Sequence, residues 1–391
     1  MTVSIQFQYV ILLFALFVLP RILIRFRIPT AVTSFAIGVL CTEYDLFVAD
    51  QTITLLSMFG IVSLFLLAGL EADLKAFRYE TSVITQHLVF ALISLLGFGF
   101  LLWYYGDTEF RPALLIGLAI LTPSTGFILD SIHALQMDQD EKFWIKTKAI
   151  ATEILALIVL FVVLKSSSLE EFGVSTGILL VMILGLPIVL WIFSKWVVPY
   201  APRSEFAFLL VTATVCAFLT KKLGVYYLVG AFIVGLAAQR FRKNLPSIAS
   251  ENMLHAVEFF SSFFVPFYFF YAGLNVQKGD FTKNAIVLGG LLLLVFVPLR
   301  ALQIMVHRRV VMKEKIHRSI RISVTMTPTL VFTLVIANIL RDRFAIDPAI
   351  FGGLILYAIF NTMIPSFLFH DPTPEYESHQ LDDLDYLDID R

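Results

Sequence analysis

Two ionisable side chains lie deep inside long apolar stretches of this sequence, where a charge is costly. Glu153 lies in KAIATEILALIVLFVVL, and Arg300 lies in LLLLVFVPLRALQIMV. A carboxyl group taken out of water favours its neutral form, whereas a nearby cation favours the charged form. Glu153 is therefore predicted to bind a proton or a cation in turn near neutral pH. The alternative is that it pairs with Lys146 or Lys148 near the end of the stretch.

Arg300 stays charged at any accessible pH, so it needs a carboxylate, carbonyl groups or water. We expect it to pair with Glu153 or with the carbonyls at the end of an interrupted helix. The alternative is that its side chain extends toward the membrane surface near His307 and Arg308.

Other polar residues near the ends of apolar stretches are weaker candidates. His87 and Glu258 are further candidates for buried charges, although a position at the membrane surface is favoured for both. Glu71 is expected to be a structural residue at the membrane surface. Cys41 and Cys216 are isolated cysteines in apolar context, so they predict neither a disulfide framework nor a metal site.

The elements that carry these residues are predicted to cross a membrane. Hydrophobic residues make up 58% of the chain, charged residues 15%, and the mean hydropathy is +0.85. A soluble domain is nearer a quarter charged. Stretches of about 17 to 25 apolar residues, each able to span a hydrocarbon core as a helix, predict an all-α polytopic protein with thirteen spans at 6–24, 29–47, 52–70, 83–105, 112–135, 146–165, 174–196, 204–220, 225–240, 255–274, 284–307, 318–341 and 347–370.

The distribution of basic residues predicts the orientation of the chain. No basic residue precedes the first span, and Arg21, Arg25 and Arg27 follow it, so the N-terminus should lie outside and the C-terminus in the cytoplasm. With this orientation, 19 of the 29 Lys and Arg fall inside and 8 outside. Lys221 and Lys222 are the main exceptions to the positive-inside rule.

The charge pattern also divides the chain into two parts. Residues 1–370 are predicted to form one transmembrane domain. Residues 371–391 include the acidic run DDLDYLDID and are too poor in apolar residues to fold alone. We expect them to form a disordered cytoplasmic tail.

An internal repeat relates the two halves of the transmembrane domain. LFLLAGLEADL in the third span resembles FYFFYAGLNVQK in the tenth, and ILTPSTGF in the fifth resembles VTMTPTLVF in the twelfth. Gly69 and Gly273 are separated by almost the same number of residues as Pro123 and Pro328. Because the copies are seven spans apart, they should cross the membrane in opposite directions. Inverted repeats of this kind are typical of secondary transporters.

The two Thr-Pro pairs predict helix breaks. Pro123 and Pro328 each remove one backbone hydrogen bond and clash with the preceding turn. Such breaks survive in a membrane only inside protein or beside a water-filled cavity, so two opposed breaks should bring helix ends and oxygen ligands together. The hydroxyls expected there are those of Thr122, Ser124, Thr125, Thr327 and Thr329. The alternative is that each pair is an ordinary kink.

In order along the chain, several segments resemble monovalent cation/proton antiporters of the bacterial branch, which includes sodium/proton and potassium/proton exchangers. The segments are IPTAVTSFAIGVL, GIVSLFLLAGLEADL, LAILTPSTGFIL, KAIATEILALIVLF, VYYLVGAFIVGLAAQ, FFSSFFVPFYFFYAGLNV and the span of Arg300, which together cover roughly residues 6–370. The resemblance implies a homodimer, crossed broken helices in spans five and twelve, and elevator-like alternating access.

The resemblance also implies roles for individual residues. In that family the sixth span carries an acidic pair, or Asn or Gln followed by Asp, and the second residue binds the transported ion and the proton. Thr152 and Glu153 occupy those positions, so the carboxylate is kept and its partner becomes a neutral hydroxyl. The family's basic residue in the eleventh span corresponds to Arg300. Glu153 is thus the expected ligand of the transported monovalent cation, with Thr152 beside it.

These residues lead to expectations about exchange and partners. One carboxylate beside an arginine that keeps its proton favours electroneutral one-for-one exchange, with Na⁺ or K⁺ as the cation. We expect no cofactor and no nucleic-acid partner. The potassium-efflux branch often adds a nucleotide-binding domain after the last span, and only about 20 residues follow here. Regulation of that kind would need a separate subunit.

Two other functions fit the same sequence. The first is transport of another small solute, such as an organic anion attracted to Arg300, and the second is a membrane scaffold or sensor without transport. The chain has no Walker loop, HExxH motif or nucleophile elbow, so an enzyme is not expected. The predicted location is a bacterial inner membrane.

Overall fold

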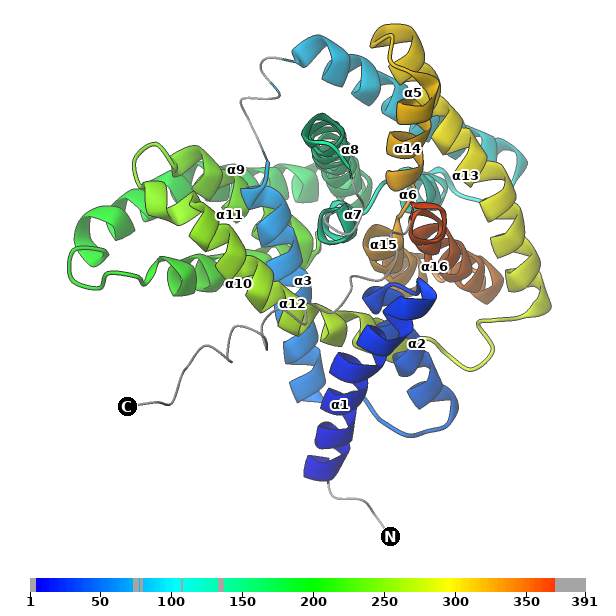
Figure 1. Ribbon diagram of the computed structural model, residues 1–391, viewed down its shortest axis with the longest axis horizontal. Coiled ribbons are helices and arrows are strands. Elements are labelled where there is room, and N and C mark those ends of the chain that lie inside the picture. Colours follow the sequence, from blue (N-terminus) through cyan, green and yellow to red (C-terminus); the bar gives the residue numbers. More distant parts are fainter. Residues whose placement is uncertain (1–4, 73–76, 78–79, 107, 133–136, 370–391) are drawn as a thin grey trace, which may run out of the picture.

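The computed structural model describes residues 5–72, 77, 80–106, 108–132 and 137–369 as a set of helices, with no strand among those residues (Figure 1). The predicted acidic tail, 371–391, lies outside the described residues. The helices are α1 (Ile5–Leu23), α2 (Thr30–Glu43), α3 (Gln51–Leu70), α5 (Thr81–Tyr105), α6 (Phe110–Leu121), α7 (Thr125–Ile132), α8 (Gln139–Lys165), α9 (Leu169–Ile192), α10 (Glu205–Lys222), α11 (Tyr227–Phe241), α12 (Glu251–Leu274), α13 (Lys283–Val311), α14 (Ile316–Thr325), α15 (Leu330–Phe344) and α16 (Pro348–Phe369).

The helices confirm an all-α membrane protein. Within the described chain, nine helical segments are long and apolar enough to cross a membrane, or ten if the bent pair α14 and α15 counts as one span. The helices α2 and α11 are apolar but shorter. Each of the thirteen predicted ranges contains a helix. Thirteen crossings nevertheless remain a prediction.

Side-chain caps fix where several of these helices begin. Asp50, Ser168, Ser250 and Thr282 each accept a hydrogen bond from a backbone N–H in the first turn of the helix that follows. Asp138 does the same for α8, and Glu141 bonds back to the Asp138 N–H to complete a capping box. Such caps satisfy N–H groups that have no partner within the helix.

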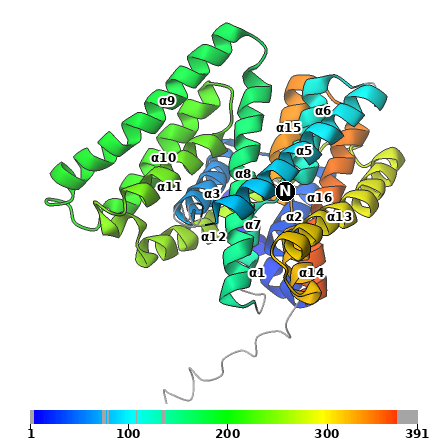
Figure 2. The same cartoon turned by 90° about the horizontal axis from the view of Figure 1, so that it is seen from above.

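The helices pack into two bundles. Helix α9, which joins the bundles along the chain, follows α8 and lies beside α11 (Figure 2). The first bundle contains α1, α2, α3, α10, α11 and α12, and the second contains α5 to α8 and α13 to α16. Helix α3 of the first bundle contacts α7 of the second. This contact brings the predicted break after α6 to the boundary between the bundles.

Two glycine contacts support the predicted inverted repeat. Helices α2 and α12 cross where Gly38 meets Gly273, and α3 and α11 cross where Gly69 meets Gly235. A Cβ atom on Gly38 would lie 2.1 Å from the Phe270 carbonyl oxygen, so only glycine permits this approach. Each crossing joins one helix from the first half of the chain to one from the second, and the inverted repeat stays a prediction.

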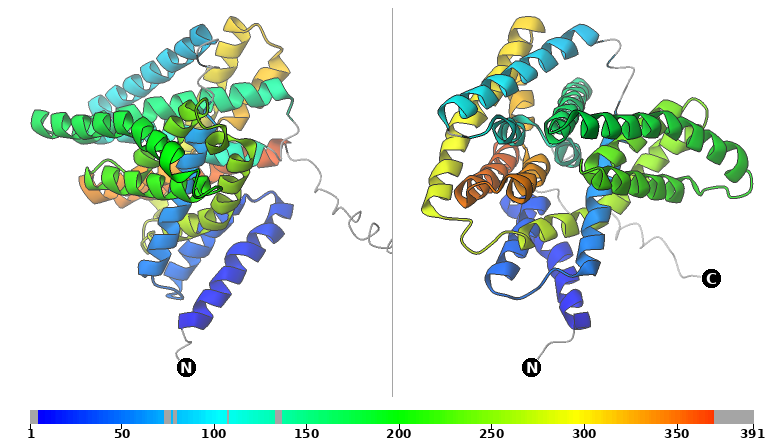
Figure 3. Two further views of the ribbon diagram at one scale, coloured as in Figure 1. Left: turned by 90° about the vertical axis from the view of Figure 1, so that its left-hand side faces the viewer. Right: turned by 180° about the vertical axis from the view of Figure 1, so that it is seen from behind.

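The helices differ sharply in how far they are buried. Within the 18 most apolar consecutive residues of Phe110–Leu129, 94% are buried. The corresponding share in α5 is 11%. Helix α1 lies along the outside of the first bundle, against α2 and α12 (Figure 3). Apolar helices that expose most of their surface are suited to contact with lipid. The broken segment α6–α7 is therefore central and α5 is peripheral.

Candidate functional site

Two interruptions of helical backbone lie at the centre of the molecule. The chain leaves helical geometry between Leu121 and Thr125, where Pro123 lies, and between Thr325 and Leu330, where Pro328 lies. The second pair of helices is bent by 42°. Proline lacks the N–H that continues a helix, which accounts for both interruptions.

The two interruptions contact each other. The Ser124 N–H donates to the Pro328 carbonyl at 2.8 Å, and the Phe332 N–H donates to Ser124 Oγ at 3.2 Å. The Thr333 hydroxyl donates to the Ala119 carbonyl at 2.6 Å. Backbone groups released from one helix are thus satisfied by the other, as the membrane interior requires.

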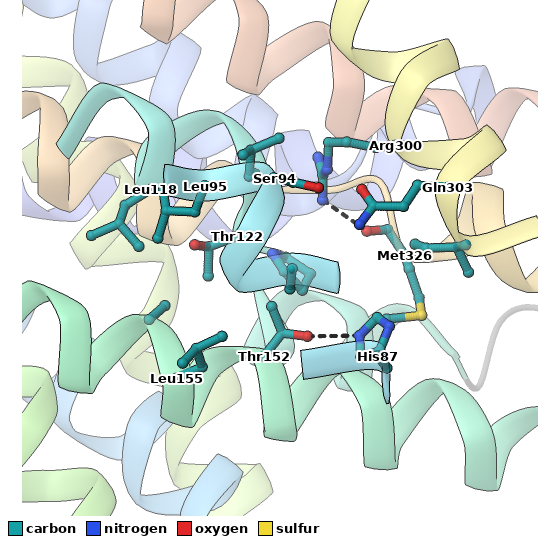
Figure 4. Close-up of a pocket in the computed structure, with 15 residues that line it drawn as sticks. His87, Ser94, Leu95, Leu118, Thr122, Thr152, Leu155, Arg300, Gln303 and Met326 are labelled. Carbon is teal, nitrogen blue, oxygen red and sulfur yellow. Dashed lines mark hydrogen bonds between the residues drawn. The ribbon is translucent and has the colours of Figure 1, made fainter. Parts of the chain in front are cut away.

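Arg300 binds the end of α14. Its side chain is 4% exposed, and its guanidinium donates to the Thr327 carbonyl at 2.7 Å. It also donates to the Met326 carbonyl at 3.1 Å (Figure 4). These carbonyls lie at the negative end of the helix dipole. Pairing with helix-end carbonyls was one of the two expectations for Arg300. The other was wrong, because the described residues contain no Arg300–Glu153 ion pair.

Two residues of α16 hold the interruptions together, and sequence reasoning missed both. Tyr357 accepts from Arg300 at 3.2 Å and donates to the Ile120 carbonyl at 3.0 Å. Asn361 donates to Thr329 Oγ1 at 2.9 Å, and its carbonyl oxygen accepts from the Thr329 N–H at 3.3 Å. A usable signal existed, since an asparagine inside an apolar helix must find a partner.

Glu153 lies on α8 and is 1% exposed. The Thr125 hydroxyl, at the start of α7, is close enough to interact with its carboxyl group. Among the residues that the structure describes, Glu153 Oε2 and Thr125 Oγ1 are both buried without a hydrogen-bond partner. A buried acid and a buried hydroxyl therefore share an unsatisfied position beside a helix N-terminus.

The alternative partners of Glu153 are engaged elsewhere. Lys146 pairs with Glu71 at 3.0 Å, and Lys148 Nζ lies 3.2 Å from His307 Nδ1. Pairing of Glu153 with either lysine was therefore the wrong alternative. The ion pair also gives Glu71 the structural role expected of it.

The hydroxyls expected at the breaks fall into two groups. Ser124 and Thr329 accept hydrogen bonds from other parts of the chain, and the Thr327 hydroxyl donates to the Val324 carbonyl at 2.8 Å. Thr122 instead lines a small cavity together with Thr152 and Arg300 (Figure 4). Of the five hydroxyls, Thr125 is the one beside Glu153.

His87 is buried, which corrects the expectation of a position at the membrane surface. Its Nε2 lies 3.0 Å from Thr152 Oγ1 (Figure 4). The Thr152 hydroxyl donates its only proton to the Lys148 carbonyl. The histidine must therefore donate through Nε2–H. Glu258 is part-exposed and pairs with His255 at 3.0 Å, in keeping with a surface position.

A buried basic group continues from this point along α8 and α13. Lys148 and Arg308 lie 5.8 Å and 5.7 Å from the centre of the Trp144 ring. Arg308 is fully buried and pairs with Glu314. The tryptophan face and the one carboxylate stabilise cations that would otherwise be costly to bury.

A cavity of about 650 Å³ separates the bundles on one side of the interruptions. Its walls include Arg21 of α1, Ser34 of α2, Glu71 and Glu258 from the first bundle, and Gly126 of α7 from the second. Gly126 follows Thr125 in the sequence, so the cavity is lined by the direct neighbour of the residue beside Glu153.

Comparison with solved structures identifies proteins that share this fold. The structure of the sodium proton antiporter MjNhaP1 from Methanocaldococcus jannaschii at pH 8 aligns with a TM-score of 0.68 and 15% identity, covering 93% of this chain and 96% of that one. An electron-microscopy structure of the same antiporter aligns with a TM-score of 0.66 and 14% identity over both full chains. The protein is thus an integral membrane protein with the fold of a proton antiporter.

The sequence defines the family more closely. Residues 10–370 match the transmembrane region of the sodium/hydrogen exchangers, and the chain belongs to this family. It is 25% identical to the probable Na⁺/H⁺ antiporter 3 of M. jannaschii, covering 92% of this chain and 95% of that relative. It is 23% identical to the putative Na⁺/H⁺ antiporter YjbQ of Bacillus subtilis, covering 92% of this chain but only 62% of that relative.

Proposed function

We propose that this protein exchanges a monovalent cation for protons across a membrane, with Glu153 binding each in turn. The names of its relatives make Na⁺ the first cation to test, with K⁺ as the second. The transported cation is the substrate, and it would be held by the Glu153 carboxylate and by oxygen atoms near the interruptions, Thr125 first among them.

The observation that carries this proposal is the unsatisfied carboxyl oxygen of Glu153. An ionised carboxylate buried without a partner costs roughly 3 kcal/mol or more in a membrane interior. The group therefore needs either a proton or a cation at all times. Because both ligands remove the same cost, binding of one favours release of the other, which is the coupling that exchange needs.

The environment of Arg300 favours cations over anions as the substrate. Its guanidinium already binds two carbonyls of α14 and Tyr357. An anion would have to displace these contacts. The same contacts keep Arg300 as a fixed charge, so one proton for one cation is the exchange that a single free carboxylate supports.

The arrangement of the bundles supports alternating access of the elevator type. The cavity between the bundles opens beside Arg21 and His255, on the side that the charge distribution assigns to the cytoplasm. At the opposite end Arg341 of α15 donates to the Asn275 carbonyl at 2.9 Å, and Arg343 donates to the Gly224 carbonyl at 2.7 Å. We infer that movement of the second bundle past the first would exchange which end is closed.

The remaining parts of the proposal concern topology and assembly. We propose thirteen crossings with the N-terminus outside, a homodimer, and a bacterial inner membrane as the location.

The experiment that tests the function is proton movement in proteoliposomes that contain the purified protein. Na⁺, K⁺ or Li⁺ is added outside, and Glu153→Gln and Glu153→Asp are measured beside the wild type. We expect cation-dependent proton flux in the wild type, none with Glu153→Gln, and a reduced rate with Glu153→Asp. An imposed membrane potential should leave the wild-type rate unchanged if the exchange is electroneutral.

The control is Glu171→Gln, a change to an exposed carboxylate on α9 that should leave the flux intact. Flux that survives in Glu153→Gln would refute the role of Glu153. Absence of flux with every cation, in folded protein, would favour another solute or a scaffold without transport.

A further inference from the structure

A groove runs between α9 and α11, away from the site of Glu153. Its walls are Pro187, Ile188 and Trp191 of α9 and Ala237, Arg240 and Phe241 of α11, with Asn244 at its end. One end of the groove is thus polar and the rest is apolar. This division matches an amphipathic ligand with one charged end.

Five exposed basic residues belong to the chain segments at the polar end of the groove. Arg240 lines the groove, Arg242 and Lys243 lie between the lining residues Phe241 and Asn244, and Lys195 and Arg203 follow the end of α9. These five residues are called the basic cluster. None of the ion pairs found within the described residues includes a member of the cluster, whereas Arg318 pairs with Asp138 and Asp140. The nearby Glu205 is buried and accepts a hydrogen bond from Ser247 at 3.0 Å. The positive charges of the cluster are therefore available to bind an anionic ligand.

Two tryptophans place the cluster at the level of lipid headgroups. Trp191 and Trp196 are both largely exposed, and Lys195 lies 4.9 Å from the centre of the Trp191 ring. Tryptophan favours the boundary between hydrocarbon and water, and basic residues just beyond it attract anionic lipids. The polar end of the groove thus lies where a phosphate group would lie.

Exposed apolar side chains of α9 continue from the groove toward the middle of the helix. Val181, Leu184 and Ile188 lie on the same helix and are exposed. A chain that entered the groove beside Ile188 would pass along these side chains toward the membrane centre.

We propose that this groove binds an anionic phospholipid from the leaflet at this end of α9. The phosphate contacts Arg240 and its neighbours in the cluster, and one acyl chain lies against Ile188 and Trp191. The bound lipid holds α9 against α11. Because α9 joins the two bundles, the lipid fixes this connecting helix to the first bundle. The proposal is independent of the transported ion.

The test is quenching of tryptophan fluorescence by lipids brominated on their acyl chains, in vesicles of phosphatidylglycerol or phosphatidylcholine. The contribution of Trp191 is the difference between the wild type and Trp191→Phe. We expect stronger Trp191 quenching by the brominated anionic lipid, since each cation near the surface adds about a fivefold preference. Arg240→Gln/Lys243→Gln should abolish this difference.

The control is Arg25→Gln/Lys313→Gln, which removes two exposed basic residues elsewhere and should keep the preference. Equal quenching by both lipids in the wild type would overturn the proposal, as would a preference that survives in Arg240→Gln/Lys243→Gln. Weak quenching by both lipids, with crosslinks between copies at α9, would show that a second copy of the chain covers the groove instead. None of these results depends on transport, so they are separate from the test of Glu153.

Discussion

Thr152 precedes the buried Glu153 on α8. Its hydroxyl donates to the Lys148 carbonyl at 2.8 Å and accepts from His87 at 3.0 Å. The hydroxyl therefore acts both as a donor and as an acceptor within the protein. This residue positions the buried histidine, and Glu153 is left as the only acid at the site among the described residues.

We predict that Thr152→Val destabilises the protein by about 1 to 3 kcal/mol, because the buried His87 N–H loses its acceptor. The measurement is unfolding of the purified protein in detergent. Thr214→Val is the control, since the Thr214 hydroxyl only donates to a carbonyl of its own helix. Equal losses in the two variants would contradict the role of Thr152.

Thr125, unlike Thr152, should contribute little to stability, since its hydroxyl has no hydrogen-bond partner within the described chain. We predict that Thr125→Val leaves stability nearly unchanged and raises the cation concentration for half-maximal flux about tenfold, as expected for loss of roughly 1.5 kcal/mol from a contact to a charge. Ser124→Ala should instead lower stability, because Ser124 accepts from Phe332. A stability loss without a change in cation dependence would remove Thr125 from the site.

At the scale of elements, a capping box fixes the start of α8, the helix that carries Glu153. Asp138 accepts from the Glu141 N–H at 2.7 Å and pairs with Arg318 of α14 at 2.9 Å. The hydrogen bond from Glu141, followed by the charge of Arg318, holds the pKa of Asp138 below its usual range. The cap therefore ties the helix of the carboxylate to one of the interrupted helices.

We predict that Asp138→Ala costs about 1 kcal/mol of stability at neutral pH. The lowered pKa means that the unfolded chain takes up the proton more readily, so the contribution of Asp138 is complete above the usual carboxyl pKa of about 4 and is lost as pH falls through the lower folded value. Unfolding of both proteins at neutral and acidic pH measures this. Ser168→Ala removes the cap of α9. Because the serine hydroxyl does not titrate, the stability loss of this variant should persist in acid. A deficit of Asp138→Ala that did not shrink in acid would disprove the ionic part of the cap.

At the scale of the whole molecule, two arginines of α15 join the bundles at the end opposite the large cavity. Arg341 donates to the end of α12 and to Asp280, and its guanidinium lies 3.2 Å from the centre of the Phe351 ring. Arg343 reaches the turn between α10 and α11. These contacts cross from the second bundle to the first, so they favour the arrangement in which this end is closed.

We predict that Arg341→Gln/Arg343→Gln shifts the population toward the arrangement with the large cavity closed. Ser262 lines that cavity and is exposed. Ser262→Cys, in a background without Cys41 and Cys216, therefore reports the opening of the cavity by the rate of labelling with a water-soluble thiol reagent. We expect labelling to slow about tenfold for a shift of roughly 1.4 kcal/mol. Lys283→Gln, a nearby exposed change, is the control. An unchanged labelling rate in the arginine variant would show that these contacts do not set the balance.

The sequence by itself determined the helices, the two interruptions and the buried acid. Apolar length, a proline inside a helix and a carboxyl group far from water each carry a cost that local sequence reveals, whatever the helix packs against. Glu153, Pro123 and Pro328 could therefore be recognised without a structure.

Only the tertiary structure decided which groups satisfy one another. Arg300 had two expected partners, and the helix-end carbonyls prevailed because α14 ends beside it. His87, Tyr357 and Asn361 could not be assigned, since their hydrogen bonds join residues that are 32 to 237 positions apart. Which hydroxyl is free for an ion depends on which are consumed by these bonds, and that is set by how the helices pack rather than by any local run of residues.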